Sequence, residues 1–302
     1  MSHPYCSVFL RHALFVAIFS FPILNIVSAR AIDEDVVPDI AQAAEVNERI
    51  SERMALLDSF HEASSRYQLT HLEGFGGSAS GNVNLFNNVL SIALWPMIHL
   101  GGDLPLFVGG GPAESLLLVG NPELNVKGRV YSNLQREFPH FIYLNGWLQF
   151  PRRGSAAILV DRTDLGVSAE IKKIFYRFIL SSDFGFVSRI DPKNSDSRYG
   201  DEIFVGIGGE YYFPSLPIAV ESSLVWRNAW SATIDGTDIP QQSIMTSSNN
   251  IKYQPWGGVW FEGGVDVPLK SGNLGQIAAL FGDYAASGLW GTTLWFNVRY
   301  QF

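Results

Sequence analysis

The last residues of the chain, 290–302, alternate between apolar and polar side chains, and no other segment restricts the fold as strongly. Successive side chains of a β-strand point to opposite faces. In an extended chain one face would carry Trp290, Thr292, Leu294, Phe296, Val298, Tyr300 and Phe302, and the other Gly291, Thr293, Trp295, Asn297, Arg299 and Gln301. One apolar face and one mostly polar face are typical of a membrane barrel strand, which has lipid outside and water inside.

The same residues resemble the C-terminal assembly signal of Gram-negative outer-membrane β-barrels. That signal is a terminal Phe, here Phe302, preceded at steps of two by aromatic and apolar residues, here Tyr300, Val298 and Phe296. The resemblance implies an all-β fold: a transmembrane antiparallel β-barrel, inserted into outer-membrane lipid by the barrel assembly machinery. No specific barrel family is resembled over the whole chain.

Residues 1–31 have the organisation of a secretory signal peptide. Arg11 precedes an apolar stretch, 13–27, and residues 29–31 (Ala-Arg-Ala) fit a small-x-small cleavage site. A membrane anchor is the weaker interpretation, because the stretch is short for a span of ~20 residues and contains Pro22. We therefore predict a cleaved signal, export across the inner membrane and location in the cell outer membrane.

Composition agrees with a barrel in a membrane. Aromatic residues make up 13% of the chain and charged residues only 17%, against a usual charged fraction of about 25%. Beyond the predicted signal no apolar run reaches the ~18 residues that a membrane helix needs. A protein that crosses a membrane without helices must pair its backbone hydrogen bonds in a closed barrel.

Cysteine content and net charge exclude several classes of function. The single cysteine, Cys6, lies in the predicted signal, so the mature chain would have no disulfide, thiol chemistry or cysteine-bound metal. The formal charge is −8, and loss of Arg11 and Arg30 with the signal makes it more negative. Nucleic-acid binding needs a basic surface, so it is not expected.

Residues 32–66 are predicted as a periplasmic or plug segment that contains an amphipathic helix over 40–65, followed by the barrel over 67–302. Apolar residues recur there at steps of three and four: Ala43, Val46, Ile50, Met54, Leu57 and Phe60. The helix either plugs or packs on the barrel mouth, or self-associates and serves a periplasmic partner. The heptads are few and imperfect, which favours the first interpretation.

The number of strands follows from the alternating segments. Strands are predicted over 126–136, 141–150, 157–171, 174–188, 201–213, 216–228, 255–268, 275–284 and 290–302. Residues 82–125 are expected to be mostly strand, without a legible layout. Counting back from the C-terminus gives about 10 to 12 strands, with 12 favoured.

Polar residues on the face opposite the apolar set are predicted to line the lumen: Glu202, Glu210, Glu221, Arg227, Trp260, Glu262, Asp266, Trp295 and Arg299. Two interpretations remain open. Carboxylates around a pore would favour cations, whereas Glu and Arg paired across the interior would fill a barrel of this intermediate width.

Connection lengths predict which way up the barrel sits. Short connections at 213–217 and 268–274 would be periplasmic, and long polar ones at 189–200 and 230–252 extracellular. Interfacial aromatic residues would then form a periplasmic rim and an outer rim. Tyr211, Phe213, Tyr300 and Phe302 belong to the first rim, and Trp226 and Trp290 to the second.

A catalytic or metal site is not indicated. The four histidines after the predicted signal show neither a His-x-Ser pattern nor metal-ligand spacing, and no cofactor motif is present. We therefore expect a protein that is not an enzyme. The favoured function is a narrow channel for small solutes, or a conduit for an export system. The alternative is a non-conducting barrel that presents its extracellular loops for interaction.

Overall fold

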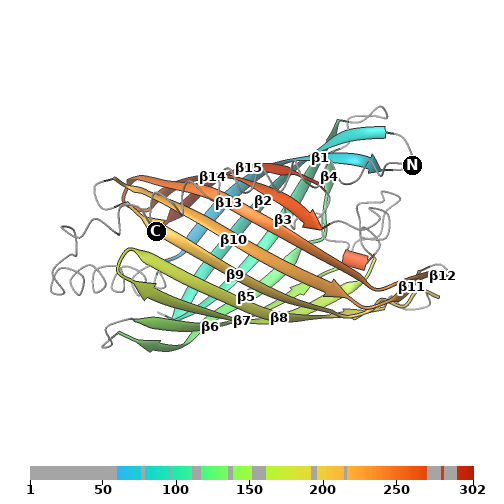
Figure 1. The fold of residues 1–302 in the computed structure, drawn as a ribbon, viewed down its shortest axis with the longest axis horizontal. Coiled ribbons are helices and arrows are strands. Elements are labelled where there is room, and N and C mark those ends of the chain that lie inside the picture. Colours follow the sequence, from blue (N-terminus) through green and yellow to red (C-terminus); the bar gives the residue numbers. More distant parts are fainter. Residues whose placement is uncertain are drawn as a thin grey trace, which may run out of the picture. The chain divides into compact units, whose positions relative to one another are not determined.

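The computed structural model describes residues 60–75, 79–95, 97–110, 117–134, 139–151, 161–191, 196–213, 216–234, 236–270, 280–281 and 291–302. A closed antiparallel barrel of 12 strands dominates this part of the chain (Figure 1). Its strands are β1 (Glu62–Phe75), β2 (Ala79–Trp95), β3 (Ile98–Gly110), β5 (Glu123–Asn133), β6 (His140–Gln149), β7 (Thr163–Phe175), β8 (Phe178–Ile190), β9 (Glu202–Tyr212), β10 (Ile218–Ala229), β13 (Gln242–Trp256), β14 (Val259–Lys270) and β15 (Thr293–Gln301). The all-β fold class and the favoured strand number are confirmed.

Three shorter strands are present in addition to the 12 strands of the barrel wall. β4 (Leu117–Val119) pairs with the end of β3, and β11 (Ala232–Ile234) forms a small hairpin with β12 (Thr237–Ile239). Neighbours in sequence are neighbours around the barrel, and the wall closes where β1 pairs with β15. Closure leaves no open sheet edge, which a barrel in a membrane requires because lipid cannot satisfy unpaired backbone groups.

The wall has one apolar and one polar face, as β15 illustrates. Leu294 and Phe296 are 56% and 47% exposed, whereas the intervening Trp295 is 8% exposed. Large exposed apolar side chains recur on other strands, including Leu144, Val167, Phe184 and Ile207. Exposure of so many such residues on one face is stable in lipid and would be an aggregation hazard in water.

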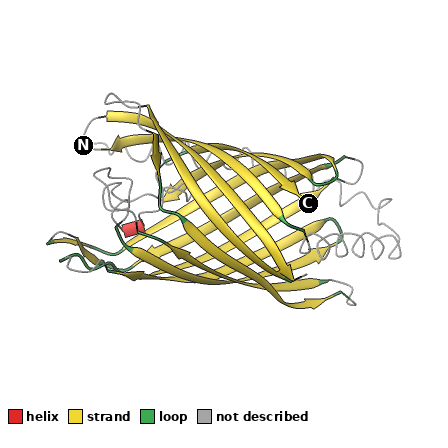
Figure 2. Ribbon diagram, turned by 180° about the vertical axis from the view of Figure 1, so that it is seen from behind, coloured by secondary structure: helices red, strands yellow, loops and turns green. Residues whose placement is uncertain are grey.

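The two ends of the barrel differ. The end that we call the turn end carries the β9–β10 connection (213–217), the turn Gly257–Gly258 between β13 and β14, and Phe302. Gly258 has a φ of 81°, and a Cβ there would lie 2.6 Å from the carbonyl oxygen of Gln301, so only glycine fits this turn. The opposite end, the loop end, carries the β11–β12 hairpin, which projects beyond the wall (Figure 2).

The predicted strands between 126 and 228 are found as β5 to β10, with shifted ends. Two predicted elements near the C-terminus are wrong. The segment 255–268, predicted as one strand, contains the β13–β14 turn, and Leu280 and Phe281, predicted as strand within 275–284, are helical. The connection predicted at 268–274 as short and periplasmic is also wrong, because β14 continues to Lys270 and ends at the loop end.

Other corrections concern strands that the sequence did not reveal. β13 begins at Gln242, inside the predicted loop 230–252. It was not predicted as a strand because polar Ser247 and Asn249 interrupt the apolar face of its sequence pattern. β1 begins at Glu62, so the last residues of the predicted helix 40–65 are strand. The rest of that helix, the predicted signal peptide and Trp290 lie outside the described residues.

Candidate functional site

The nine side chains predicted to line the lumen all lie on the wall face opposite the exposed apolar belt. Glu202 is completely buried, and Trp260, Asp266 and Trp295 are almost so. The others are partly buried and make ion pairs or hydrogen bonds with neighbouring strands. Because alternation carries these residues inward, their chemistry is that of the barrel interior.

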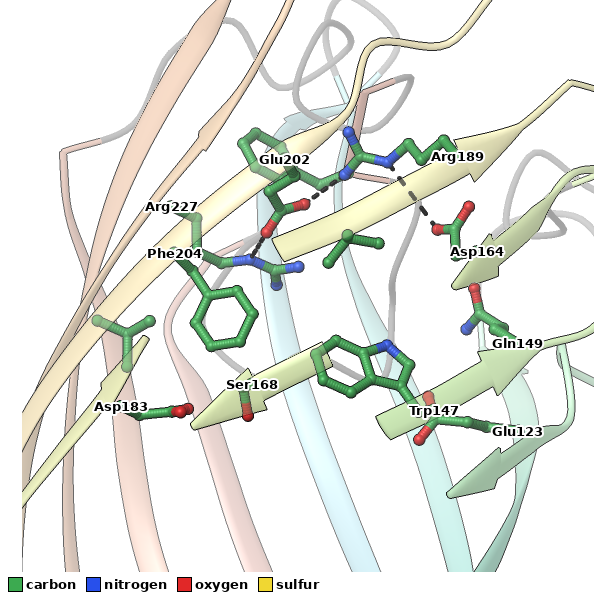
Figure 3. Close-up of a pocket in the computed structure, with 13 residues that line it drawn as sticks. Glu123, Trp147, Gln149, Asp164, Ser168, Asp183, Arg189, Glu202, Phe204 and Arg227 are labelled. Atoms are coloured by element: carbon green, nitrogen blue, oxygen red, sulfur yellow. Dashed lines mark hydrogen bonds and ion pairs between the residues drawn. The ribbon is translucent and has the colours of Figure 1, made fainter. Parts of the chain in front are cut away.

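At the loop end, charged side chains form a continuous group that we call the loop-end cluster: Arg162, Asp164, Arg189, Glu202 and Arg227. Glu202 accepts hydrogen bonds from both Arg189 and Arg227. Arg162 holds Asp164 with two bonds, of 2.8 Å from Nε and 3.2 Å from an Nη nitrogen. Such bidentate and bridged pairs are the strong form of charge-assisted hydrogen bond. The bonds to Glu202 fix the guanidinium groups of Arg189 and Arg227 against the wall (Figure 3).

Nearer the turn end, each predicted carboxylate also has a basic partner. Lys252 lies 3.0 Å from Glu210 and 2.7 Å from Glu221. Arg299 contacts Glu262 at 2.9 Å, and Arg66 contacts Asp266 at 3.2 Å. The interior is therefore not an unopposed ring of carboxylates.

Sequence reasoning missed three of the basic partners for a common reason. Lys252 and Arg189 were assigned to predicted loops, and Arg66 to the predicted segment before the barrel, whereas all three lie on strands. The inward direction of Arg66 and Lys252 follows from the places of β1 and β13 in the wall, and that of Arg189 from the end of β8 at Ile190.

A cavity of about 340 Å³ lies inside the wall at the loop end (Figure 3). It spans strands β5 to β10 and lies against the loop-end cluster. Its lining residues are Glu123, Trp147, Gln149, Asp164, Ser168, Asp183, Val187, Arg189, Glu202, Phe204, Val225, Arg227 and Phe281.

Two aromatic rings form one side of this cavity because glycines leave room for them. A Cβ at Gly166 would lie 1.9 Å from the indole of Trp147, and one at Gly185 would lie 2.1 Å from the ring of Phe204. Each ring thus lies flat over a glycine of the neighbouring strand. The two rings approach to 6.0 Å between centroids, leaning toward each other over β7 and β8.

Phe281 covers the cavity from the loop end. It is 1% exposed, and its ring lies 5.4 Å from the guanidinium carbon of Arg227 and 5.8 Å from that of Arg189. Phe281 belongs to the connection between β14 and β15, yet it contacts residues of β8 and β10. Phe281 therefore lies inside the barrel, at the loop end of the cavity.

Two further features concern the residues that the structure describes. They contain no group of three His, Cys, Asp or Glu side chains arranged to hold a metal ion. None of their helical segments has both the length and the apolar character needed to cross a membrane.

Comparison with known proteins shows the fold. No protein-family profile matches the chain, and neither does any curated protein. Among solved structures, an outer membrane channel from Pseudomonas putida F1 aligns over 81% of this chain and 96% of its own, with a TM-score of 0.60 and 12% identity. The KdgM porin aligns over 80% of this chain and 99% of its own, with a TM-score of 0.45 and 10% identity. The first likeness shows that the chain has the fold of an outer-membrane β-barrel.

Proposed function

We propose that the protein is a narrow channel for small solutes in the outer membrane. The observation behind this proposal is that the ion pairs on the inner wall run along the wall and not across the lumen. Ion pairs such as that of Arg66 on β1 with Asp266 on β14, and that of Lys252 on β13 with Glu210 on β9, join strands only two apart in the wall order. A barrel filled by salt bridges would need pairs between opposite strands. Side chains held along the wall instead leave the axis for solutes and water.

The same pairs bear on selectivity. Because Glu202, Glu210 and Glu221 each have a basic partner, only a modest preference for cations is expected from the wall as a whole. The narrowest part is expected at the cavity, where Trp147 and Phe204 project from the wall and Phe281 folds in above them.

The route to the membrane is part of the proposal. Residues 1–31 would direct export and be removed, and the outward residues Phe296, Val298, Tyr300 and Phe302 would be read by the barrel assembly machinery. The segment before Glu62 would plug the turn end from the periplasm or serve a periplasmic partner there, such as a component of an export system. Exposed aromatic residues of the turn end, Tyr300 and Phe302 among them, suit a membrane interface.

A second candidate is a non-conducting barrel that presents its loop end to a partner. The observation in its favour is the order of that end: the β11–β12 hairpin is joined to the preceding connection by a bridge between Arg198 and Thr233. An ordered projection is a better epitope than a flexible loop, because less entropy is lost on binding.

Planar-bilayer recordings test the proposal. The refolded chain from residue 32 and a second chain from residue 61, just before β1, are compared with detergent alone. Discrete conductance steps in either chain support a channel, and larger steps in the shorter chain support a plug. Absence of conductance in both chains, with the barrel shown to be folded by its heat-modifiable gel mobility, would refute the channel. The surface-interaction barrel would then stand.

A further inference from the structure

We propose that the cavity beneath Phe281 is a binding site for small organic cations, with Asp183 as the charged anchor and Trp147 and Phe204 as aromatic walls. The proposal rests on the channel function only in requiring that solutes enter the lumen. It adds the chemical class that the narrowest part would hold.

The charges of the lining favour a cation. Four lining carboxylates, Glu123, Asp164, Asp183 and Glu202, face two guanidinium groups. Both guanidinium groups bond to Glu202, and Asp164 is held by Arg162 from outside the lining. With Arg162 included, four carboxylates face three guanidinium groups, so the site carries one negative charge in excess.

Asp183 has the least satisfied charge of the four carboxylates. Its carboxylate accepts a hydrogen bond from Ser168, but no ion pair joins it to a described residue, and its Oδ1 atom is buried without a hydrogen-bond partner among them. Nearby Glu170 is matched by Lys127 and Lys172. A partly buried carboxylate without an ion-pair partner is costly, and a bound cation would lower that cost.

The wall leaves space beside Asp183. Its cross-strand partner on β9 is Gly206, where an added Cβ would lie 3.6 Å from the Cβ of Asp183. Gly208 follows on the same inward face. Ser181 and Ser223 fill the space over Gly208, so the room next to the carboxylate is that left by the missing side chain of Gly206.

The aromatic pair adds recognition of an organic cation over a bare metal ion. Trp147 and Phe204 lie on strands β6 and β9, on either side of Asp183, which is on β8. Ammonium groups and their adjoining carbon atoms bind to aromatic faces, with Trp the strongest. The cavity volume of about 340 Å³ is within the range of small-molecule sites, and a few polar groups beside an apolar wall are their usual lining.

The test uses three probes of one shape: benzylammonium, benzyl alcohol and benzoate. Isothermal titration calorimetry on the refolded protein in detergent micelles measures binding without any need for conductance. Benzylammonium is expected to bind about tenfold more tightly than benzyl alcohol, which corresponds to roughly 1.4 kcal/mol, and benzoate more weakly than either. Equal or tighter binding of benzoate would overturn the proposal.

Variants assign the binding to the site. Asp183→Asn is expected to remove the advantage of benzylammonium over benzyl alcohol, and Trp147→Leu to weaken both. Asp238→Asn, which removes a carboxylate from the β12 hairpin, is the matched control and should bind like the parent. If Asp183→Asn keeps the full preference for benzylammonium while folded, Asp183 is not the anchor and the proposal fails. Conductance without benzylammonium binding would refute the proposed cation site alone. Binding without conductance would refute the proposed channel function alone.

Discussion

Arg162 donates a hydrogen bond of 3.0 Å to the backbone carbonyl of Phe281, 119 residues further along the chain. Arg162 is 1% exposed, and its other contacts hold Asp164 at the start of β7. One side chain thus ties Phe281, between β14 and β15 in the sequence, to the residues that precede β7. Since a carbonyl is recognised and not a particular side chain, the contact fixes the position of the backbone while Phe281 itself packs over the cavity.

The first prediction concerns this tie. The double variant Arg162→Ala, Asp164→Ala removes the hydrogen bond without leaving a lone buried charge, which would by itself cost about 3–5 kcal/mol. We expect Phe281 to move away from the cavity and single-channel conductance to rise. Arg198→Ala, which changes an exposed arginine at the same end, is the control. Unchanged conductance in a folded double variant would mean that Phe281 does not limit the opening.

The second prediction concerns the glycine beneath Phe204. Gly185→Ala places a Cβ 2.1 Å from the ring, so Phe204 must turn toward the lumen. We expect a loss of about 1–3 kcal/mol in the free energy of unfolding, as for other overpacked sites, together with lower conductance. Urea unfolding and bilayer recording measure the two effects.

Two further variants separate this clash from a general effect of alanine. Gly257→Ala has open space around its Cβ and should change neither quantity by much. Adding Phe204→Ala to Gly185→Ala should recover conductance, because the displaced ring is gone. If the double variant conducts no better than Gly185→Ala alone, the ring is not the obstruction.

The third prediction concerns the lipid face. Val298 is 37% exposed between Asn297 and Arg299, which point inward. Val298→Arg should reduce the free energy of unfolding in lipid by roughly 2–4 kcal/mol if it lies near the bilayer midplane. Val298→Leu, which keeps the apolar surface, should lie close to the parent. Equal stability of the two variants would contradict the assignment of this face to lipid.

The parts of the fold that were predictable share one property: regular alternation. β15 alternates throughout and the β9–β10 hairpin is interrupted only at Gly209 and Ser222 of its outward face, so their faces and many of their inward side chains follow from the sequence. β1 was missed because its outward face begins with Ala63 and Ser65, which carry little apolar signal. When the outward face carries few large apolar residues and the inward face is polar, the apolar–polar alternation that identifies a strand is absent.

The candidate site was only half visible for a different reason. Glu202 and Arg227 were found as inward charges, but Phe281 and Asp183 were not. Phe281 lies on none of the wall strands, and strand periodicity carries no information about where such a residue is placed. Asp183 lies on a strand that was predicted. Its accessibility to a ligand depends on its cross-strand neighbour Gly206, which has no side chain. Contacts between strands are set by register, which the sequence of one strand does not state.

The last prediction separates two roles of the C-terminal residue. The backbone of Phe302 exchanges two hydrogen bonds of 3.0 Å with His61 and so helps to close the wall between β15 and β1. Its side chain is 52% exposed and stacks on Tyr300, with ring centroids 5.6 Å apart. The backbone bonds serve stability, whereas the exposed ring is available to the assembly machinery.

Phe302→Asp keeps the backbone bonds and changes only the ring. We expect its level in the outer membrane to fall about tenfold or more while export to the periplasm continues, and its refolding in detergent to match that of the parent. Phe302→Tyr, which keeps an aromatic ring, is the control. Membrane fractionation with a periplasmic extract measures the distribution, and gel mobility measures refolding. If Phe302→Asp reaches the outer membrane at the parent level, the terminal ring is not an assembly signal. If it fails to refold in detergent as well, the ring acts through stability.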